Sequence, residues 1–198
     1  MVPGEKYHLY NHANGRENIF TEQKNYAFFL KKLAHHILPV CKLFSYCMMP
    51  NHFHLVLQVR CQEELRLLWQ KLPHSPVLSQ KQVELKTSKS FSNLFSSYTQ
   101  AYNKVYNRMG SMFIPSMKME KIVDNNDFCK VVNYTHCNPV HHGFSEKISD
   151  WPHSSYKIFL SNSPTNLQRD YVLEMFGGLD AFIKYHEQPV DFKNKRLE

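Results

Sequence analysis

The segment at residues 48–57, MMPNHFHLVL, constrains the fold more than any other part of the sequence. Its apolar end predicts a buried strand, and the Pro-Asn pair predicts the turn by which the chain enters that strand. Side chains two residues apart in a strand point to the same face, so His52 and His54 should share one face while Phe53 packs on the other. Two imidazoles fixed in this way are a candidate site for a divalent metal. The alternative is two buried histidines that hydrogen-bond to the backbone or to water.

The size and composition of the chain predict one folded domain with a tail. The chain has 198 residues, of which 42% are hydrophobic and 14% aromatic, and this is enough to bury a core. We expect the domain to span residues 1–160 and a helical extension to span residues 161–198. No apolar run approaches the length of a membrane span, and the first residues lack the apolar core of a signal peptide, so we expect no membrane association.

Charge and cysteine usage indicate the compartment and the partner. The five cysteines form no C-x-x-C pair, which favours reduced thiols and a cytoplasmic protein. A formal net charge of +7 and a pI of about 9.1 favour a polyanionic partner, nucleic acid before a membrane surface. For a prokaryotic cell these features predict a protein of the cytoplasm that associates with the nucleoid.

The order of the predicted elements gives the fold class. A strand at residues 6–12, a helix between residues 21 and 39, and strands at residues 41–49 and 52–57 form the opening of a ferredoxin-like α+β layout. We therefore predict an antiparallel sheet, as in RRM-like folds, with helices packed on it. The later predictions are a helix at 62–72, a mobile loop at 73–88, a long helix from 91 to 110, a strand ending near 123, a helix from 128 closed by Pro139 and Gly143, an aromatic clamp at 151–156, short helices at 171–175 and 180–186, and a frayed end at 191–198.

The helix that follows the Asp/Asn cluster at residues 124–127 carries a second set of candidate residues. Tyr134 and Asn138 are four residues apart and share one helical face. The amide oxygen of Asn138 can complete a His-His-oxygen set of metal ligands, and the phenol of Tyr134 is a candidate nucleophile. This combination fits phosphodiester cleavage, in which a metal polarises the phosphate and the tyrosine attacks in line. The structural alternatives are a half-buried tyrosine and an asparagine that caps the helix end.

Other residues compete for these roles. Tyr98, Tyr102 and Tyr106 recur at helical spacing in the long helix, where a core role is the expectation for the first two. A zinc-stabilised fold that uses His52 and His54 with Cys47 or Cys137 is a further alternative, although the sequence has no paired cysteine spacing.

Three segments together resemble a known protein family. Residues 49–57, MPNHFHLVL, resemble the histidine-hydrophobe-histidine (HUH) signature of single-tyrosine transposases. Residues 133–143, NYTHCNPVHHG, resemble the tyrosine helix of the REP-associated branch, Y-I-x-x-N-P-V-x-x-G, with a threonine beside the tyrosine in place of the usual isoleucine. Residues 150–156, DWPHSSY, match the W-P-x-S-S-Y of that branch. The resemblance covers residues 5–160 and predicts an HUH endonuclease fold for the domain.

The resemblance implies a role for each residue that matches a motif. It implies that His52 and His54 are metal ligands, Tyr134 the nucleophile and Asn138 a further ligand. It also implies Mg²⁺ or Mn²⁺ as the metal, single-stranded or hairpin DNA as the substrate, and a 5′-phosphotyrosine intermediate with a free 3′-OH. Family members act as monomers or as dimers, so a homodimer is one expected assembly.

The predicted function is cleavage and strand transfer on single-stranded or hairpin DNA, and the alternative is a domesticated binder of structured DNA or RNA with the same fold and no turnover. The alternative is motivated by residues 111–118, SMFIPSMK, which lack the basic run that the family often carries after the glycine that ends the long helix. The candidate DNA contacts are basic residues outside the apolar stripes. They are Arg16, Lys86, Lys89, Lys104, Arg108 and Lys118.

Overall fold

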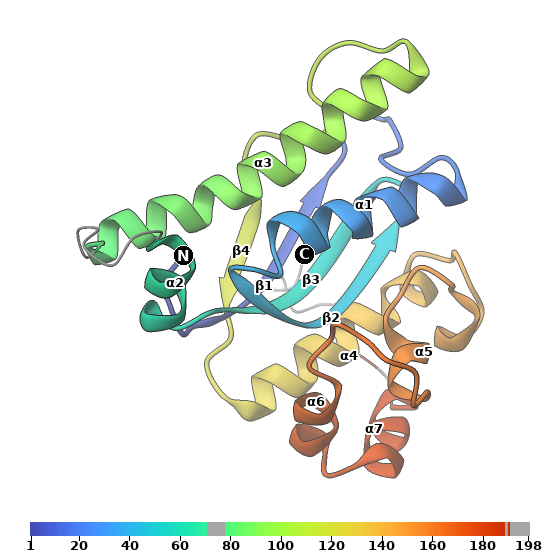
Figure 1. The fold of residues 1–198 in the computed structure, drawn as a ribbon. Coiled ribbons are helices and arrows are strands. Elements are labelled where there is room, and N and C mark those ends of the chain that lie inside the picture. Colours follow the sequence, from blue (N-terminus) through green and yellow to red (C-terminus); the bar gives the residue numbers. More distant parts are fainter. Residues whose placement is uncertain (71–77, 189, 191–198) are drawn as a thin grey trace.

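A four-stranded antiparallel sheet forms the centre of the fold, as a computed structural model of the chain shows (Figure 1). The structure describes residues 1–70, 78–188 and 190. The strand order is β2-β3-β1-β4, and β1 and β3 lie in the middle. The strands are β1 (Lys6–His12), β2 (Cys41–Met49), β3 (His52–Val59) and β4 (Lys118–Lys121).

Helices cover both faces of this sheet (Figure 1). The helices α1 and α3 lie on one face, whereas α4 and the C-terminal helices lie on the other. The order up to β4 is β-α-β-β-α-α-β, and β1 and β3 are central. Apart from the added short helix after β3, this is the ferredoxin-like arrangement, so the predicted α+β class is confirmed. The helices are α1 (Gln23–His36), α2 (Gln62–Trp69), α3 (Gln80–Tyr106), α4 (Asn125–His141), the 3₁₀ helix η1 (Ile148–Asp150), α5 (Tyr156–Phe159), α6 (Arg169–Phe176) and α7 (Leu179–His186).

The hairpin of β2 and β3 forms where the sequence predicts it, around the turn at residues 50–51. Phe53 points to the α1/α3 face, where its ring centroid lies 5.1 Å from that of Phe29 and 6.0 Å from that of Phe95. The alternate residues of β3 therefore face α4. This placement is the structural basis of the candidate site.

The predicted mobile loop at residues 73–88 is wrong over its second half. Residues 73–77 lie outside the described part of the chain, but α3 already begins at Gln80. Ser79 caps this helix by accepting a hydrogen bond from the backbone N–H of Gln82, and buried Val83 and Thr87 continue the apolar stripe of the helix by two further turns. The polar composition that suggested a loop is the solvent face of an amphipathic helix.

The end of α4 also differs from the prediction. Asp124 caps the helix as expected, since its side chain accepts a hydrogen bond from the backbone N–H of Asp127. However, Pro139 does not close α4, which continues to His141. A proline removes one backbone donor, and this close to the C-terminus the loss affects little of the helix. Gly143, with φ of 71°, follows the end of the helix in the left-handed conformation.

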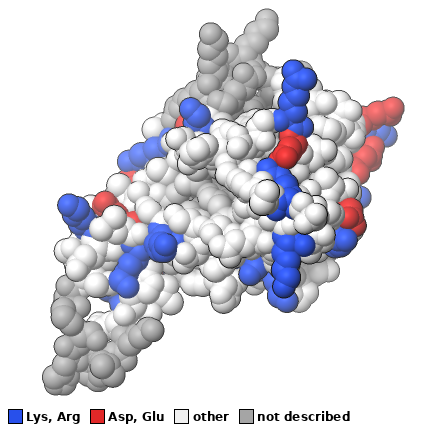
Figure 2. Space-filling view, turned by 90° about the horizontal axis from the view of Figure 1, so that it is seen from above, with Lys and Arg blue, Asp and Glu red and all other residues white. Residues whose placement is uncertain are grey.

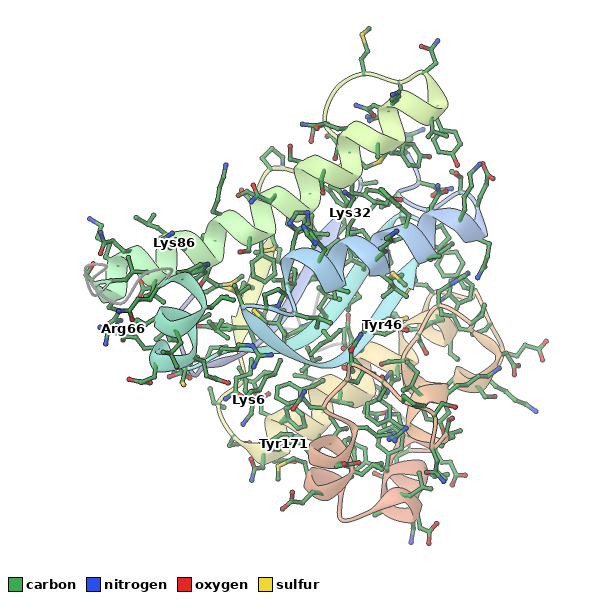
Figure 3. The ribbon with its side chains drawn as sticks, viewed as in Figure 1. Lys6, Lys32, Tyr46, Arg66, Lys86 and Tyr171 are labelled. Atoms are coloured by element: carbon green, nitrogen blue, oxygen red, sulfur yellow. The ribbon has the colours of Figure 1, made fainter. Side chains whose placement is uncertain are left out.

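The aromatic segment at residues 151–156 packs along the outer edge of β2, which confirms the predicted clamp. The indole N–H of Trp151 donates to the carbonyl of Met48 at 3.0 Å, and the backbone N–H of Ser155 donates to the carbonyl of Tyr46 at 2.9 Å. The helices α6 and α7 form as predicted, whereas the frayed end at 191–198 lies outside the described residues. The ammonium of Lys6 lies 5.3 Å from the ring centroid of Tyr171, and this contact ties α6 to the sheet (Figure 3). In the described part of the chain, no helix is long and apolar enough to cross a membrane.

A buried histidine pair joins α4 to α7. Nδ1 of His136 lies 2.9 Å from Nε2 of His186, and Nδ1 of His186 donates to the carbonyl of Phe182 at 2.8 Å. Because a carbonyl only accepts, the neutral His186 ring must accept at Nε2 and His136 must donate to it. Burial lowers the pKa of His186 to about 4, opposed by the bond to Phe182, and burial followed by the charge of His186 lowers the pKa of His136 far below its usual range.

We expect His186 to make the fold acid-sensitive. Its folded pKa lies below the unfolded value, so its contribution to stability is complete above pH 6.5 and is lost as the pH falls from 6.5 toward 4. The loss at pH 5 is about 2 kcal/mol. A His186→Gln variant, which keeps an acceptor toward His136, should lose less unfolding free energy than the wild type between pH 7.5 and 5 in urea titrations. Replacing the exposed His35 by glutamine is the control, and equal slopes for wild type and His186→Gln would contradict the assignment.

Candidate active site

The two histidines of β3 share the sheet face beneath α4, as the sequence predicts. The ring centroids of His52 and His54 are 5.3 Å apart, and the rings are nearly perpendicular. Both side chains are buried, with exposed fractions of 3% and 2%. The strand therefore holds two imidazoles side by side on a packed surface, with little freedom to move.

Strand β1 adds two histidines that the sequence analysis did not assign to the site. The β1–β3 register sets Tyr10 opposite His54 and His12 opposite His52, so the alternate residues of β1 share the face of the β3 histidines. The ring of His8 stacks on His54 at 5.1 Å, and that of His12 stacks on His52 at 4.7 Å. The i, i+2, i+4 spacing of His8, Tyr10 and His12 in a predicted strand is the signal that could have revealed them.

Burial keeps these imidazoles neutral at pH 7. It lowers the pKa of His8 to about 3 and that of His54 far below its usual range, where the charges of His8 and His52 add to the effect. Burial also lowers the pKa of His52 to about 3, with smaller contributions from His12 and His142 and an opposing one from Asn138. Neutral imidazoles keep a nitrogen lone pair and do not repel a cation, and both properties suit a metal ligand.

Helix α4 places Tyr134 over the histidines. Its ring centroid lies 5.6 Å from that of His54 and 5.8 Å from that of His8, edge-on in both cases, and its side chain is 2% exposed. The helix is buried from Phe128 to Pro139 except at Lys130, and it packs mainly against β2 and β3. One chain therefore brings the predicted nucleophile to the predicted metal ligands.

Asn138 lies one helical turn beyond Tyr134 and offers an oxygen to the site. Its amide nitrogen donates to the carbonyl of Tyr134 at 3.2 Å, while its buried Oδ1 has no hydrogen-bond partner among the described residues. The Asn138 amide lies close enough to His52 to oppose, in part, the lowering of the His52 pKa by burial. The two side chains nevertheless form no hydrogen bond of good geometry. A buried oxygen without a donor carries a desolvation cost that a bound cation would remove.

Both β3 histidines are contacted at Nδ1. Nδ1 of His52 lies 2.8 Å from Oδ1 of Asn51, and Nδ1 of His54 lies 2.9 Å from Nε2 of His8. These contacts leave Nε2 of each ring as the nitrogen that can ligate a metal. Together with Oδ1 of Asn138, the residues fit a divalent cation held by two nitrogens and one oxygen, with water completing the coordination.

The tyrosines of α3 do not belong to this site. Tyr98 donates to the carbonyl of Ile19 at 2.7 Å, and Tyr106 donates to the carboxylate of Glu22 at 2.7 Å, both on the α1/α3 side of the sheet. Tyr10 is the tyrosine that the sequence analysis missed, since its ring lies 5.4 Å from that of His54. Among the described residues, Tyr134 and Tyr10 are thus the two tyrosines whose rings lie against that of His54.

The zinc alternative finds no support in the described part of the chain, where no three His, Cys, Asp or Glu side chains converge on a point that could hold a metal. Burial raises the pKa of Cys47 far above its usual range, and burial raises the pKa of Cys137 to about 12. Both thiols are therefore protonated in the metal-free protein.

The candidate DNA contacts are spread over the surface and do not converge on Tyr134. Lys86, Lys89 and Lys104 are exposed along α3, and the first and last of these are about 27 Å apart along the helix axis. Lys86 lies near α2, with its ammonium 5.5 Å from the ring centroid of Trp69 (Figure 3). Figure 2 shows basic side chains dispersed over one face with acidic ones among them. Arg16 is exposed between β1 and α1. Lys118 pairs with Tyr10 across β4 and β1, so its side chain lies on the same face of the sheet as the histidines.

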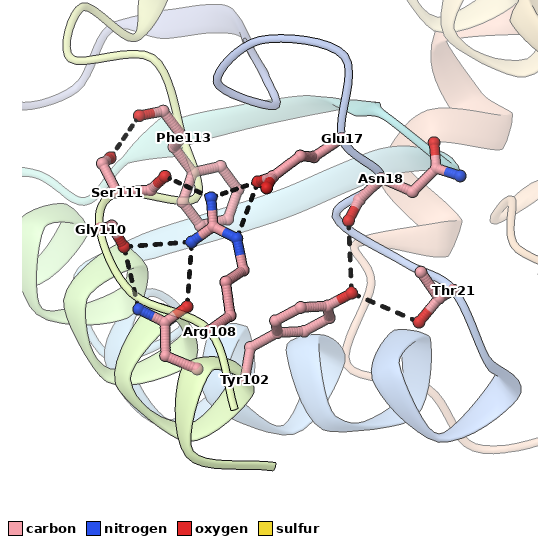
Figure 4. Close-up of polar contacts among 9 residues, drawn as sticks. Glu17, Asn18, Thr21, Tyr102, Arg108, Gly110, Ser111 and Phe113 are labelled. Atoms are coloured by element: carbon pink, nitrogen blue, oxygen red, sulfur yellow. Dashed lines mark hydrogen bonds and ion pairs between the residues drawn. The ribbon is translucent and has the colours of Figure 1, made fainter. Parts of the chain in front are cut away.

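Arg108 is engaged within the protein and has no N–H left for a phosphate. Its guanidinium donates to the carboxylate of Glu17 from Nε and Nη2, to Asn103 and the carbonyl of Gly110 from Nη1, and to the carbonyl of Ser111 from Nη2 (Figure 4). These contacts use all five donors of the side chain. Arg108 therefore holds the turn after α3 against the loop after β1, and it does not replace the basic run that residues 111–118 lack.

We expect Arg108→Met to reduce stability without changing DNA affinity. Three carbonyl or amide acceptors and one carboxylate lose their donor, which should cost about 1–3 kcal/mol of unfolding free energy. Lys104→Met, an exposed change two helical positions before the end of α3, is the control and should leave stability unchanged. Denaturant titration and the salt dependence of DNA binding are the measurements. A stable Arg108→Met protein with a reduced salt slope would show instead that Arg108 contacts phosphate.

Comparison with known proteins supports the fold at the level of structure. The sequence matches no family model and no curated protein. Among solved structures, a REP-associated tyrosine transposase bound to a REP hairpin matches with a TM-score of 0.57 and 18% identity, over 83% of this chain and 84% of the other. The fold is that of a REP-associated tyrosine transposase. The three motifs thus predicted the correct fold, and in this transposase fold the chain brings His52, His54, Tyr134 and Asn138 together without a second copy.

Proposed function

We propose that this protein is a metal-dependent tyrosine transposase that cleaves and rejoins single-stranded or hairpin DNA. The placement of Tyr134 carries the proposal. A buried phenol lies against the ring of His54, and the buried oxygen of Asn138 lies one helical turn further on. A nucleophile next to a candidate cation site is the arrangement that phosphodiester transfer requires.

The proposed reaction uses the phenolic oxygen of Tyr134 as the attacking group. An oxygen–phosphorus bond forms between Tyr134 and the scissile phosphate, the bond from phosphorus to the 3′-oxygen breaks, and the proton of the phenol ends on the 3′-OH. The DNA 5′ end is then held as a phosphotyrosine ester, and the 3′-OH can later attack this ester to restore a strand. Because both steps exchange one phosphodiester for another, the chemistry suits rejoining as well as cleavage.

His52, His54 and Asn138 would hold Mg²⁺ or Mn²⁺. When bound, the cation supplies charge stabilisation to the phosphate oxygens. Two neutral imidazoles and a carboxamide oxygen carry no negative charge, so the ion keeps its full charge toward the DNA. The close packing of β1, β3 and α4 would hold these side chains in place around the ion and exclude much of the solvent.

The proposed substrate rests on charge and on the neighbouring structure. The protein carries a net charge of +7, and the structurally similar transposase was solved with a DNA hairpin. We propose that Lys118, on the same side of the sheet as the histidines, approaches the DNA near the site, and that Arg16, Lys86, Lys89 and Lys104 contact phosphates further away.

Denaturing gel electrophoresis tests the proposal. The wild-type protein is incubated with end-labelled hairpin and single-stranded DNA in Mg²⁺, Mn²⁺ or EDTA. A slowly migrating band that requires the cation and survives denaturation is the expected covalent adduct. If the protein binds both DNAs but forms no covalent adduct with either cation, the result would favour the domesticated binder of structured DNA or RNA.

A further inference from the structure

His8 makes a single kind of polar contact in the described part of the chain. Its Nε2 lies 2.9 Å from Nδ1 of His54, and the two rings are stacked with an interplanar angle of 14°. Its other nitrogen, Nδ1, is buried without a hydrogen-bond partner among the described residues. Burying a histidine that is 1% exposed while one of its nitrogens has no partner costs folding free energy. The bond between His8 and His54 is therefore a candidate for a functional role.

The contact between the two rings holds one proton, and the position of that proton decides whether His54 can bind a metal. If Nδ1 of His54 carries the proton, His54 donates to His8 and keeps a lone pair on Nε2. If Nε2 of His8 carries it, His54 accepts at Nδ1 and must carry its own proton on Nε2. A neutral imidazole has one N–H, so the second arrangement blocks Nε2 of His54 as a ligand.

His52 has no such choice. Its Nδ1 faces the carboxamide oxygen of Asn51 at 2.8 Å, and that oxygen can only accept, so His52 keeps its Nε2 lone pair at all times. The two candidate ligands therefore differ: Asn51 fixes one tautomer of His52, whereas His8 allows two tautomers of His54.

We propose that His8 is a positioning residue that accepts the Nδ1–H of His54 when the cation binds and so fixes His54 in the tautomer that ligates through Nε2. The inference rests on the proposed function, in which His54 is a ligand. In this proposal a residue of β1, His8, contributes to metal affinity, although it lies outside the HUH motif of β3.

Two substitutions at His8 separate this role from simple packing. His8→Phe keeps a ring of similar shape but removes the acceptor, and it should weaken Mn²⁺ binding by about 10- to 100-fold. His8→Gln places an amide oxygen the same number of bonds from Cβ as Nε2, and it should restore the affinity to within about threefold of wild type. The control is His35→Phe, which replaces an exposed histidine of α1 on the opposite face of the sheet and should leave the affinity unchanged. Isothermal calorimetry measures all three, after circular dichroism has shown that each variant is folded.

A second measurement reads the tautomer itself. Long-range ¹H–¹⁵N NMR spectra of the wild type with Mg²⁺ should show His54 protonated at Nδ1 and His8 unprotonated at Nε2. Equal Mn²⁺ affinities of wild type and His8→Phe, or an Nε2–H on His54 in the Mg²⁺ form, would overturn the role of His8 and leave the proposed function intact. A wild type that binds neither cation would instead overturn the metal site on which both proposals rest. If His8→Phe does not fold, the glutamine variant and the NMR spectra decide.

Discussion

Replacing Tyr134 by phenylalanine should abolish the covalent adduct with DNA, a loss of at least about 10³-fold in adduct formation. The change removes one oxygen atom from a side chain that is 2% exposed and leaves its ring packed against His54 and His8. The fold and the DNA affinity should therefore persist while the nucleophile is lost. Quantifying the slowly migrating band on denaturing gels, together with a binding titration on the same DNA, separates these two properties.

Tyr10→Phe is the matched control for this experiment. Tyr10 also contacts His54, with ring centroids 5.4 Å apart, and it loses the same atom. We expect this variant to keep the adduct, since Tyr10 lies in the sheet whereas Tyr134 and the oxygen of Asn138 come from one helix. An adduct that survives Tyr134→Phe and disappears in Tyr10→Phe would move the nucleophile from α4 to β1.

The parts of the fold that were predictable from sequence are those that follow from local periodicity. The alternation around His52 and His54, the turn at residues 50–51 and the four-residue spacing of Tyr134 and Asn138 each specify a backbone geometry, and the structure confirms all three. The loop predicted at residues 73–88 failed for a related reason, because a helix with an extended polar face has the composition of a loop over a short window.

The parts that were not predictable depend on contacts between segments far apart in the chain. His8 belongs to the site only because β1 pairs with β3 in a register that sets His8 and Tyr10 beside His54. Arg108 has the sequence environment of a phosphate contact, yet Glu17, 91 residues away, takes two of its donors. A short stretch of sequence reveals neither the β1–β3 register nor the pairing of Arg108 with Glu17, because both depend on the tertiary structure.

His54→Gln should remove most of the metal affinity of the protein. Loss of an outer partner of a metal ligand already costs about 10- to 100-fold in affinity, so loss of a ligand should cost at least about 100-fold. In the wild type, Mn²⁺ at a hundred times its Kd should add about 2.7 kcal/mol of stability, because the cation binds the folded chain. For a chain of this size this raises the unfolding midpoint by about 5–10 °C. Thermal unfolding with and without Mn²⁺ measures the effect, which should be absent from His54→Gln.

The control for that experiment is His35→Gln. His35 is exposed on α1, on the opposite face of the sheet from the candidate site, so its loss should leave the Mn²⁺-induced shift intact. The comparison also bears on the mechanism, since adduct formation and thermal shift must fail together if one cation serves both. If neither Mn²⁺ nor Mg²⁺ moves the wild-type midpoint while adducts form in EDTA, the buried histidines would have to act on the phosphate directly. The orphaned oxygen of Asn138 argues against that outcome, because an imidazole that donates to phosphate gains nothing from a carboxamide acceptor placed beside it.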